Sequence, residues 1–355
     1  MENSSVEASD QPVHPEEPRL TVVVPCRNEV QRIGPLLATL ASQTLDESTW
    51  EVVFVDDEST DETATVIAHW MNSQPQVKAR LLAGPPPGGK KAALAAGIAA
   101  ARSPVILTTD ADCRADRGWL AEMAAPFDNA SVQFAIGLVL YESDGSLLQD
   151  VQRIESMGLV SLGAAAAMGG QPYLANGANF AFRRAGFAAV GGYSFGGQLA
   201  SGDDTFLLEA FCRSRMAGAC VWSTHALVWT QAAPTWRAYW QQNIRWLSKA
   251  KASRNRRQKR LQVLGLLVWG GWWPLVIGLV ASGSGAAELS LLLVATALRM
   301  LADGLLTGPL RRLSGLRQPW RNWLLGQLVY AAWAPAVALR ALVGGQYSWR
   351  GRWLR

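Results

Sequence analysis

The chain has 355 residues, enough for one large domain or two ordinary ones. Its net charge of +5 combines an acidic N-terminal part with a basic C-terminal part. Residues 1–248 contain 17 Lys and Arg and 26 Asp and Glu, whereas residues 249–355 contain 16 Lys and Arg and 2 Asp and Glu. The basic residues of the second part flank long apolar segments, which indicates a membrane surface and argues against nucleic acid as the partner. The four cysteines form no CxxC pair or other metal-ligand spacing, so they are expected to be free thiols in a reducing compartment.

The N-terminal residues 1–18 are polar and contain no apolar core of a signal peptide, so they are expected to be a disordered tail. From Arg19 onward, apolar runs alternate with helical patterns. Strands are predicted at 20–26, 50–57, 77–84 and 103–110, and helices at 32–43, 60–72 and 88–101. This alternation predicts a mostly parallel sheet with helices on both faces.

Acidic residues follow two of these strands. Ligands of such sheets bind at the carboxyl ends of the strands, so Asp57 and Asp110 are expected to share one crevice. In the stretch TTDADC, Asp112 follows Asp110 after one residue. On this motif alone a turn is the commoner explanation, because Asp is frequent where strands end. The alternative is a Mg²⁺ or Mn²⁺ site, since two carboxylates offer hard oxygen ligands and substrate phosphates complete the shell.

A Gly- and Pro-rich loop, GPPPGGKKAAL, leads into the predicted helix that begins near Lys90 and Lys91. Backbone N–H groups and the helix dipole favour phosphate at such a place, and Lys adds positive charge. A Lys pair alone is more often a solvated helix start, and neither GxxxxGK[ST] nor GxGxxG occurs in the chain. Together with the acidic strand ends, however, this loop predicts a site for a nucleotide diphosphate with Mg²⁺ or Mn²⁺.

Two further polar motifs precede the apolar C-terminal part. In SGDDTFLL, Asp203 and Asp204 stand before an apolar helical run, where either residue would suit an N-cap and either could be a general base. In QQNIRWLSK, Gln242, Arg245 and Trp246 lie on a predicted helix. Arg245 could balance a phosphate and Trp246 could stack on a sugar or anchor at an interface, although the run is also an ordinary amphipathic helix.

Three apolar segments, 261–281, 286–308 and 322–344, predict two or three transmembrane helices. The first contains 21 residues and no charge. The basic segment 249–260 carries seven positive charges and should stay cytoplasmic, and the tail 345–355 is basic too. Three full crossings would place this tail outside, against the positive-inside rule, so the number of crossings is left open.

Seven stretches of the chain, taken in their order, resemble the membrane-bound members of glycosyltransferase family 2. They are VVVPCRNE, VVFVDDEST, GKKAALAAG, TTDADC, NGANFAF, SGDD and QNIRW. These are inverting nucleotide-sugar enzymes related to cellulose, hyaluronan and poly-N-acetylglucosamine synthases and to ceramide glucosyltransferases. The resemblance covers about residues 19–250 and implies an α/β fold of the GT-A (Rossmann-like) type followed by C-terminal transmembrane helices. The implied arrangement is a tail at 1–18, a GT-A domain at 19–234, an interfacial helix with the basic segment at 235–260, two to three transmembrane helices at 261–344 and a basic tail at 345–355.

The resemblance also implies roles for individual residues. The donor nucleotide-sugar is expected to contact Pro25, Arg27, Asn28, Glu29, Asp57, Lys90, Lys91, Asp110, Gln242, Arg245 and Trp246. The Mg²⁺ or Mn²⁺ ion is expected on Asp110 and Asp112, with Asp112 the better candidate for direct contact. The acceptor side is expected at Asn176, Gly177, Ala178 and Asn179. Asp204 matches the catalytic base, and Asp203 stands where the family usually has Glu, which keeps the charge but shortens the reach.

The implied function is inverting transfer of a sugar, with a UDP-sugar favoured, to a lipid or glycan acceptor at the cytoplasmic (inner) membrane, with the catalytic domain in the cytoplasm. A processive polysaccharide synthase is the alternative, although synthases usually have more membrane helices than this chain offers. An inactive, transferase-like membrane subunit is a second alternative. The sequence argues against it, because every acidic position expected at the site is filled. The segment 150–170 predicts an amphipathic helix, either at the membrane interface near the acceptor or in the core.

Overall fold

The computed structural model describes residues 18–194, 202–252, 259–260, 276, 278, 281–282, 286–316, 320–343, 347–349 and 352–354. Nearly all of the predicted span 261–281, much of the basic segment 249–260 and the tail 1–17 therefore lie outside the described residues.

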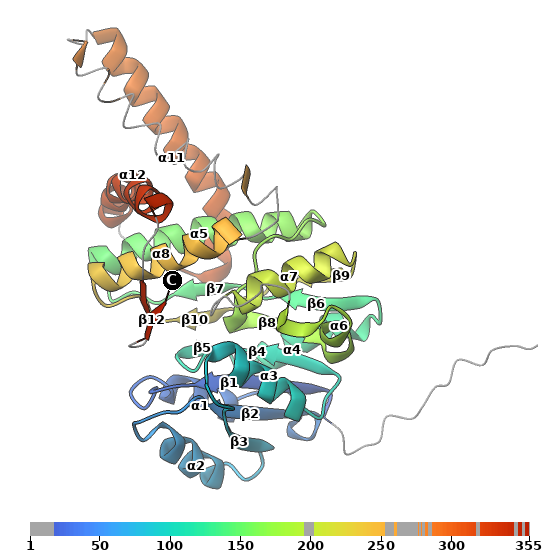
Figure 1. Cartoon of the computed structure of the whole chain (residues 1–355). Helices are drawn as coiled ribbons and strands as arrows, with labels where there is room; N and C mark the ends of the chain where they lie inside the picture. Colours follow the sequence, from blue (N-terminus) through green and yellow to red (C-terminus); the bar gives the residue numbers. More distant parts are fainter. Residues whose placement is uncertain are drawn as a thin grey trace, which may run out of the picture.

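A seven-stranded sheet forms the centre of the N-terminal part (Figure 1). Its strand order is β3 (Ala79–Ala83), β2 (Trp50–Asp56), β1 (Leu20–Cys26), β4 (Val105–Thr108), β8 (Phe180–Arg183), β6 (Val132–Ile136) and β9 (Ala217–Cys220). The first four strands are parallel, and β8 is antiparallel to both β4 and β6. The prediction of a mostly parallel α/β sheet is confirmed for these four strands, whose carboxyl ends meet at one edge.

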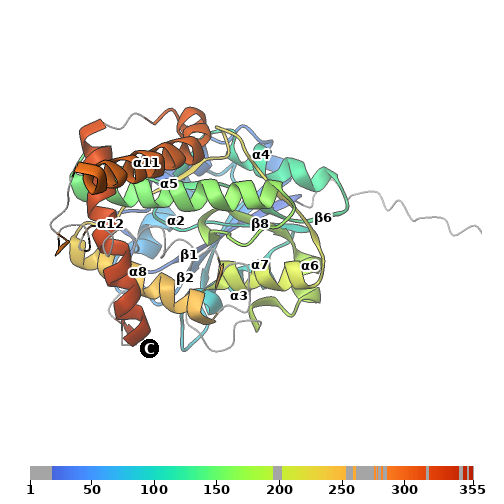
Figure 2. The same cartoon turned by 90° about the horizontal axis from the view of Figure 1, so that it is seen from above.

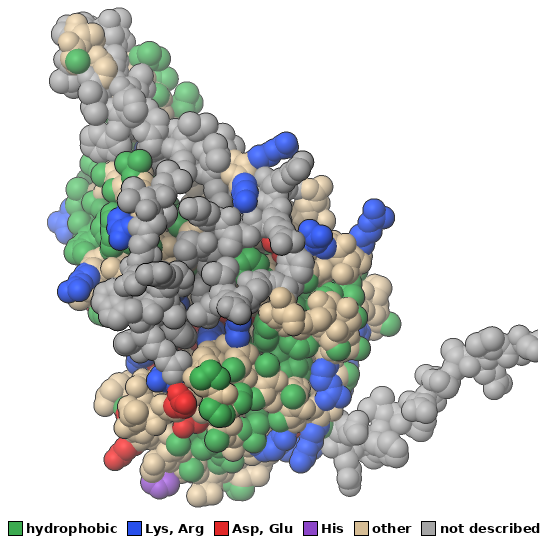
Figure 3. All heavy atoms as spheres, in the orientation of Figure 1, with side chains coloured by type: hydrophobic (Ala, Val, Ile, Leu, Met, Phe, Trp, Pro, Cys, Tyr) green, Lys and Arg blue, Asp and Glu red, His purple; other side chains and the backbone are tan. Residues whose placement is uncertain are grey.

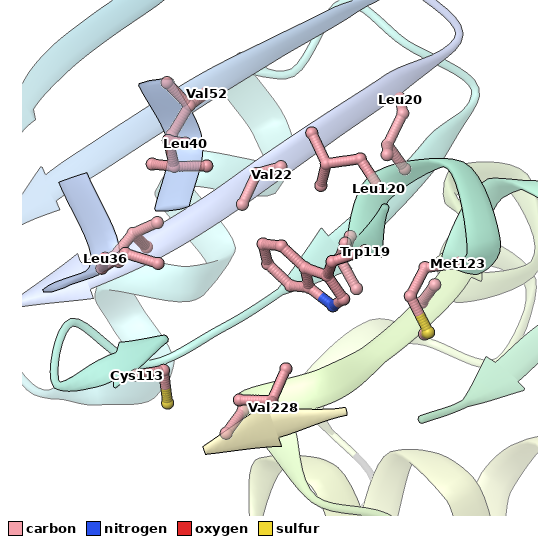
Figure 4. Packing of buried hydrophobic residues seen from close by; sticks show 14 of the residues in the cluster. Leu20, Val22, Leu36, Leu40, Val52, Cys113, Trp119, Leu120, Met123 and Val228 are labelled. Atoms are coloured by element: carbon pink, nitrogen blue, oxygen red, sulfur yellow. The ribbon is translucent and has the colours of Figure 1, made fainter. Parts of the chain in front are cut away.

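Helices cover both faces of this sheet because successive side chains of a buried strand point in opposite directions. Val22 of β1 packs in the same cluster as α1 (Gly34–Ala41), α2 (Thr63–Ser73) and α4 (Trp119–Ala124), with Trp119 at its centre (Figure 4). Its neighbour Val23 faces the opposite side, in the cluster of α3 (Lys90–Ala100) and α7 (Asp203–Arg213).

A small second sheet carries part of the site. It has the order β5 (Cys113–Ala115), β10 (Val228–Thr230) and β7 (Val139–Tyr141). Thr230 pairs with Cys113 on one side and with Tyr141 on the other. This pairing places Tyr141 and Thr230 close to Asp112, which directly precedes Cys113 in the chain. The remaining short elements are α6 (Arg184–Ala189), the 3₁₀ turns Glu47–Thr49, Ala125–Asp128, Gly177–Asn179 and Gly192–Ser194, and the hairpin of β11 (Tyr347–Trp349) and β12 (Arg352–Leu354).

Four long helices lie above the sheets: α5 (Leu147–Met168), α8 (Trp236–Ala252), α11 (Ala286–Ser314) and α12 (Trp320–Val343). Both α11 and α12 pack against α5, and α12 also contacts α8 (Figure 2). Val151 and Met157 of α5 are buried. Segment 150–170 therefore lies in a helix with a buried face, placed between the sheets and the C-terminal helices, as the core-helix interpretation expects.

The helix α11 combines an exposed part with an anchored end. Among the described residues, Ser290–Ser314 is the one helical segment long and apolar enough to cross a membrane. Leu298, Leu301 and Leu305 are exposed, whereas Leu310 is fully buried in a cluster with Leu138, which precedes β7. Hydrophobic side chains also show at the surface in the upper part of the molecule (Figure 3). The number of membrane crossings stays a prediction.

Candidate active site

The carboxyl ends of the parallel strands open into one large cavity of about 1560 Å³. Most of the residues expected at the site line it: Pro25, Arg27, Glu29, Asp57, Lys90, Asp110, Asp112, Asn176, Ala178, Asp203, Asp204, Gln242, Arg245 and Trp246. They come from strand ends, from the starts of α3 and α7 and from α8. The fold therefore gathers motifs that are more than 200 residues apart in the chain.

Lys90 is the cation at the centre of this cavity. Its Nζ lies 2.6 Å from Asp110 Oδ1 and 3.9 Å from Asp203 Oδ2. Burial alone would lower the pKa of Lys90, but the charges of Asp110 and Asp203 outweigh it and raise the pKa above its ordinary value. The lysine is therefore charged at neutral pH and lies where an anionic group of a ligand could replace a carboxylate partner.

The two carboxylates after β4 differ in their surroundings. Asp110 is paired with Lys90, whereas Asp112 Oδ2 lies 3.9 Å from Arg32 and Asp112 Oδ1 accepts a hydrogen bond of 3.5 Å from Thr230 Oγ1. No group of three or more His, Cys, Asp and Glu that could hold a metal gathers within the described part of the chain. Two carboxylates fit Mg²⁺ or Mn²⁺ where phosphate oxygens supply further ligands, so Asp110 and Asp112 suit such an ion only together with a phosphorylated substrate.

Asp57 connects the end of β2 to the glycine-rich loop before α3. Its side chain is buried, and its Oδ1 accepts a hydrogen bond of 2.5 Å from the Gly89 backbone N–H. A Cβ at Gly88 would lie 2.7 Å from the same oxygen, and Gly88 has a φ of +78°, so this position favours glycine. Arg27 donates a hydrogen bond of 2.8 Å to the Asp57 carbonyl oxygen. Together these contacts hold the loop against the cavity.

The acidic pair opens α7, where the helix dipole favours negative charge. The N-cap is Gly202, so neither Asp is the N-cap residue. Asp204 Oδ2 accepts a hydrogen bond of 3.1 Å from the Gly177 backbone N–H. A Cβ at Gly177 would lie 3.2 Å from Asp203 Oδ2, so the absence of a side chain lets the 176–179 turn approach the pair. Gly177 contributes through its backbone and is not itself among the residues that line the cavity.

Three other expected residues lie away from the cavity wall. The Asn179 side chain is fully buried: its Oδ1 accepts from Trp119 Nε1, and its Nδ2 donates to two backbone carbonyl oxygens. Lys91 Nζ lies 5.8 Å from the centre of the Phe206 ring. Asn28 Oδ1 accepts from the Thr60 backbone N–H. These contacts assign Asn179 and Asn28 to holding their loops in place.

The helix α8 forms the wall opposite the sheet. Gln242 Nε2 donates a hydrogen bond of 2.8 Å to Tyr141 Oη, and Arg245 and Trp246 line the cavity one turn further on. Burial raises the pKa of Tyr141, the charge of Glu155 adds to the rise, and Arg245 opposes it. Tyr141 is therefore a neutral phenol at neutral pH.

The cavity residues that were not expected from the sequence include Arg32, Tyr141, Thr230 and Glu155. Tyr141 and Thr230 end strands of three residues, which are too short for a recognisable pattern. The sequence gives a weak indication for Arg32, since it follows Glu29 at a helical spacing. In the structure, the Arg32 guanidinium lies 2.7 Å from the Glu29 carboxylate. Burial raises the pKa of Glu155 to about 7, against opposing hydrogen bonds from Tyr239, Tyr330 and Asn243. Nothing in the local sequence distinguishes it from a solvated glutamate of an amphipathic helix.

Comparison with known proteins agrees with this geometry. Residues 21–191 match the family model described as Glycosyl transferase family 2. A mannosyltransferase from Pyrobaculum calidifontis, solved in complex with GDP-Man and Mn²⁺, has a similar structure, with a TM-score of 0.59, 20% sequence identity and coverage of 93% of this chain and 90% of that one. At this identity the likeness shows the fold alone, which is a mixed α/β fold of the GT-A type.

Two curated relatives share parts of the sequence. A dolichyl-phosphate beta-glucosyltransferase of Trichomonas vaginalis is 40% identical over 104 residues, which are 28% of this chain and 30% of the relative. A dodecaprenyl-phosphate galacturonate synthase of Rhizobium johnstonii is 29% identical over 133 residues, which are 37% of this chain and 39% of the relative. The chain thus spans about a third of the length of these two relatives.

Proposed function

We propose, from the family 2 glycosyl transferase match over residues 21–191, that the protein transfers a sugar from a nucleotide-diphosphate sugar to a lipid acceptor at a membrane. One observation carries the proposal: the cavity that gathers Lys90, Asp110, Asp112 and Asp204 continues between α5, α11 and α12. A cavity that joins charged groups at the strand ends to a mixed apolar and polar lining between the long helices suits a soluble donor and an amphiphilic acceptor.

The donor end supplies charges for a diphosphate. Lys90 at the start of α3 and Arg245 of α8 would face its phosphate oxygens, and Asp57 would hold the nucleoside side of the site. Asp110 and Asp112 would hold Mg²⁺ or Mn²⁺, which offsets the charge that develops on a leaving nucleoside diphosphate. The UDP-sugar preference that the resemblance implies is tested with a panel of nucleotide-sugars.

Asp204 is the proposed general base. It lines the cavity at the start of α7, and its carboxylate would accept the proton from an acceptor hydroxyl that attacks the anomeric carbon. The nucleoside diphosphate leaves from the opposite face, so the product carries the inverted configuration. Asp203, which faces Lys90 at 3.9 Å, supports the charge balance of the site.

The proposed acceptor end, between the long helices, is lined by apolar side chains such as Met157 and Leu162 of α5, Leu306 of α11 and Val337 of α12, and also by the polar side chains of Glu155, Asp303 and Gln327. The two relatives are named for dolichyl-phosphate and dodecaprenyl-phosphate acceptors. A long-chain lipid is therefore the proposed acceptor class. The exposed leucines of α11 support membrane association, and the basic segment 249–260 supports a catalytic part on the cytoplasmic side of the inner membrane.

The proposal is tested with the purified full chain in detergent. A panel of nucleotide-sugars is incubated with Mn²⁺ or Mg²⁺ and with extracted membrane lipids, and sugar transfer and nucleotide release are measured. Transfer to a lipid with one donor, lost in excess chelator and in Asp112→Asn, is the expected result. Absence of transfer and of nucleotide release with the whole panel would overturn the function, and full activity in chelator would overturn the metal assignment.

A further inference from the structure

A buried carboxylate joins three helices beside the cavity. Glu155 lies in the middle of α5 and is 8% exposed. Its Oε2 accepts a hydrogen bond from Tyr239 Oη of α8, and its Oε1 accepts one of 3.3 Å from Tyr330 Oη of α12. One side chain of α5 is therefore hydrogen-bonded to both α8 and α12, through one carboxylate oxygen each.

Aromatic rings continue this junction between α8 and α12. Tyr239 stacks on Trp333 with ring centres 4.9 Å apart and planes at 6°. The Trp333 ring also lies 5.2 Å from Trp240 and 5.3 Å from Trp236, both of α8. The two helices therefore share a packed aromatic contact that Glu155 ties to α5.

This junction lies within the part of α8 that lines the cavity, one turn before Gln242. Tyr239 precedes Gln242 by three residues, and residues at this spacing share a helix face. Gln242 in turn donates to Tyr141, and Arg245 lines the cavity one turn beyond. A shift of Tyr239 would therefore displace the side chains that face the proposed donor site.

We propose that Glu155 is a positioning residue, which holds α8 against α5 and α12 so that Gln242 and Arg245 meet the donor. This inference rests on the proposed function. A buried carboxylate costs free energy even when it is hydrogen-bonded, and an apolar side chain would pack here at lower cost. Its two directed hydrogen bonds instead specify one orientation of α8 relative to α12.

The first experiment separates positioning from general stability. Transfer kinetics with the donor found in the panel above are measured for the full-chain variants Glu155→Ala and Glu155→Gln, together with thermal unfolding. We expect Glu155→Ala to raise the KM for the donor and lower kcat, by up to ~10²-fold in kcat/KM, because a small displacement of positioned groups suffices for such a loss. Glu155→Gln keeps the shape and one acceptor oxygen and should recover much of the activity.

Two further variants complete this design. Tyr239→Phe removes one hydrogen bond but keeps the stacked ring, so it tests the inference even where Glu155→Ala fails to fold. Ser161→Ala is the matched control, since Ser161 is also a buried polar residue of α5 but does not line the cavity. Wild-type kinetics in both Glu155→Ala and Tyr239→Phe, or activity losses that only follow the melting temperature across all variants, would overturn the inference.

A double-mutant cycle tests the route through α8. Because Glu155 is proposed to place both Gln242 and Arg245, the loss of transfer in Glu155→Ala/Gln242→Ala should be smaller than the product of the two single losses. Losses that simply multiply would show that Glu155 acts elsewhere.

Hydrogen exchange of the α8 amides gives a readout that needs no activity. Glu155→Ala should speed exchange in α8 and leave β1 and β2 unchanged. Unchanged exchange in α8 would contradict positioning even if the proposed function holds, whereas an inactive wild type with faster α8 exchange in the variant would contradict only the proposed function.

Discussion

Asp203 and Asp204 are neighbours in the chain with different surroundings. Both line the cavity, but Asp203 is buried and faces Lys90, whereas Asp204 accepts a hydrogen bond from Gly177 N–H. The first turn of a helix directs consecutive side chains about 100° apart, so the two carboxylates have different partners. The base is proposed at Asp204 because the family resemblance implies it, and the two different environments make the pair suitable for a comparison of variants.

Asp204→Asn is expected to bind the donor almost normally and to transfer it ~10²–10⁴-fold more slowly, because a general base acts only on the acceptor proton. Asp203→Asn is the matched variant and should be milder. Donor affinity by calorimetry is compared with transfer rate for both. A wild-type rate in Asp204→Asn would contradict the base and would point to an acceptor that arrives ionised, such as a phosphate. Loss of donor binding in both would place the pair in the diphosphate site.

At the scale of elements, the contact of α3 with the sheet depends on a missing side chain. A Cβ at Gly97 would lie 2.5 Å from Val23 Cγ1 and 3.1 Å from Val55 Cγ2, on two central strands. β-Branched side chains have little rotational freedom, so they cannot move aside easily. This close approach brings the start of α3, and with it Lys90, against the strand ends.

Gly97→Ala is therefore expected to lower the free energy of unfolding by about 1–3 kcal/mol through overpacking, despite the better helix propensity of Ala. Gly34→Ala, in α1, is the control, because no heavy atom lies within 4 Å of the added Cβ. Denaturant unfolding of both variants in detergent is the measurement. Equal stability of the two variants would contradict the close packing of α3.

The elements that could be predicted from the sequence are those with long apolar runs. The four parallel strands β1 to β4 and the helices between them fall within a few residues of their expected bounds, since burial on both faces leaves a clear pattern. The sheet of β5, β10 and β7 could not be predicted, because three-residue strands whose paired residues are 89 to 117 positions apart leave no local pattern. The same reason hid Tyr141 and Thr230, whereas the acidic and basic motifs of the site were recognisable through their family resemblance. Asn179 differs from these motifs: it belongs to one of them, but its side chain is buried in the core and does not line the cavity.

At the scale of the whole molecule, α11 presents an apolar surface that nothing in the described chain covers. Leu298, Leu301 and Leu305 are 61%, 58% and 70% exposed. Replacing all three by Gln should weaken partition into lipid vesicles, because each buried apolar side chain contributes about 1.5–3 kcal/mol to transfer from water. The triple Ala variant is the control for helix content. Flotation assays compare them, and unchanged partition would contradict the membrane role of α11.

The whole fold should also respond to pH through Glu155. Its pKa is raised from 4.5 to about 7 by burial, so the folded chain keeps this proton longer than the unfolded chain does. The stabilising contribution is complete below pH 4.5 and is lost as pH rises from 4.5 to about 7. The melting temperature of the wild type should therefore fall over this pH window relative to that of Glu155→Gln. The control is Glu47→Gln, at an exposed site, whose melting temperature should change with pH as that of the wild type does. Parallel curves for all three proteins would contradict the raised pKa.

The ion pair between Lys90 and Asp110 has a thermodynamic consequence for how two ligands would bind together. A cation bound by Asp110 would displace Lys90 from its 2.6 Å contact, and an anion bound by Lys90 would release Asp110. Either ligand alone must break the pair, whereas both together replace it by two new pairs. Cation and nucleotide should consequently bind with positive cooperativity, and each should raise the affinity of the other by the same factor. Titration of GDP and UDP with and without Mn²⁺ measures this coupling, and independent affinities would show that the pair stays closed during binding.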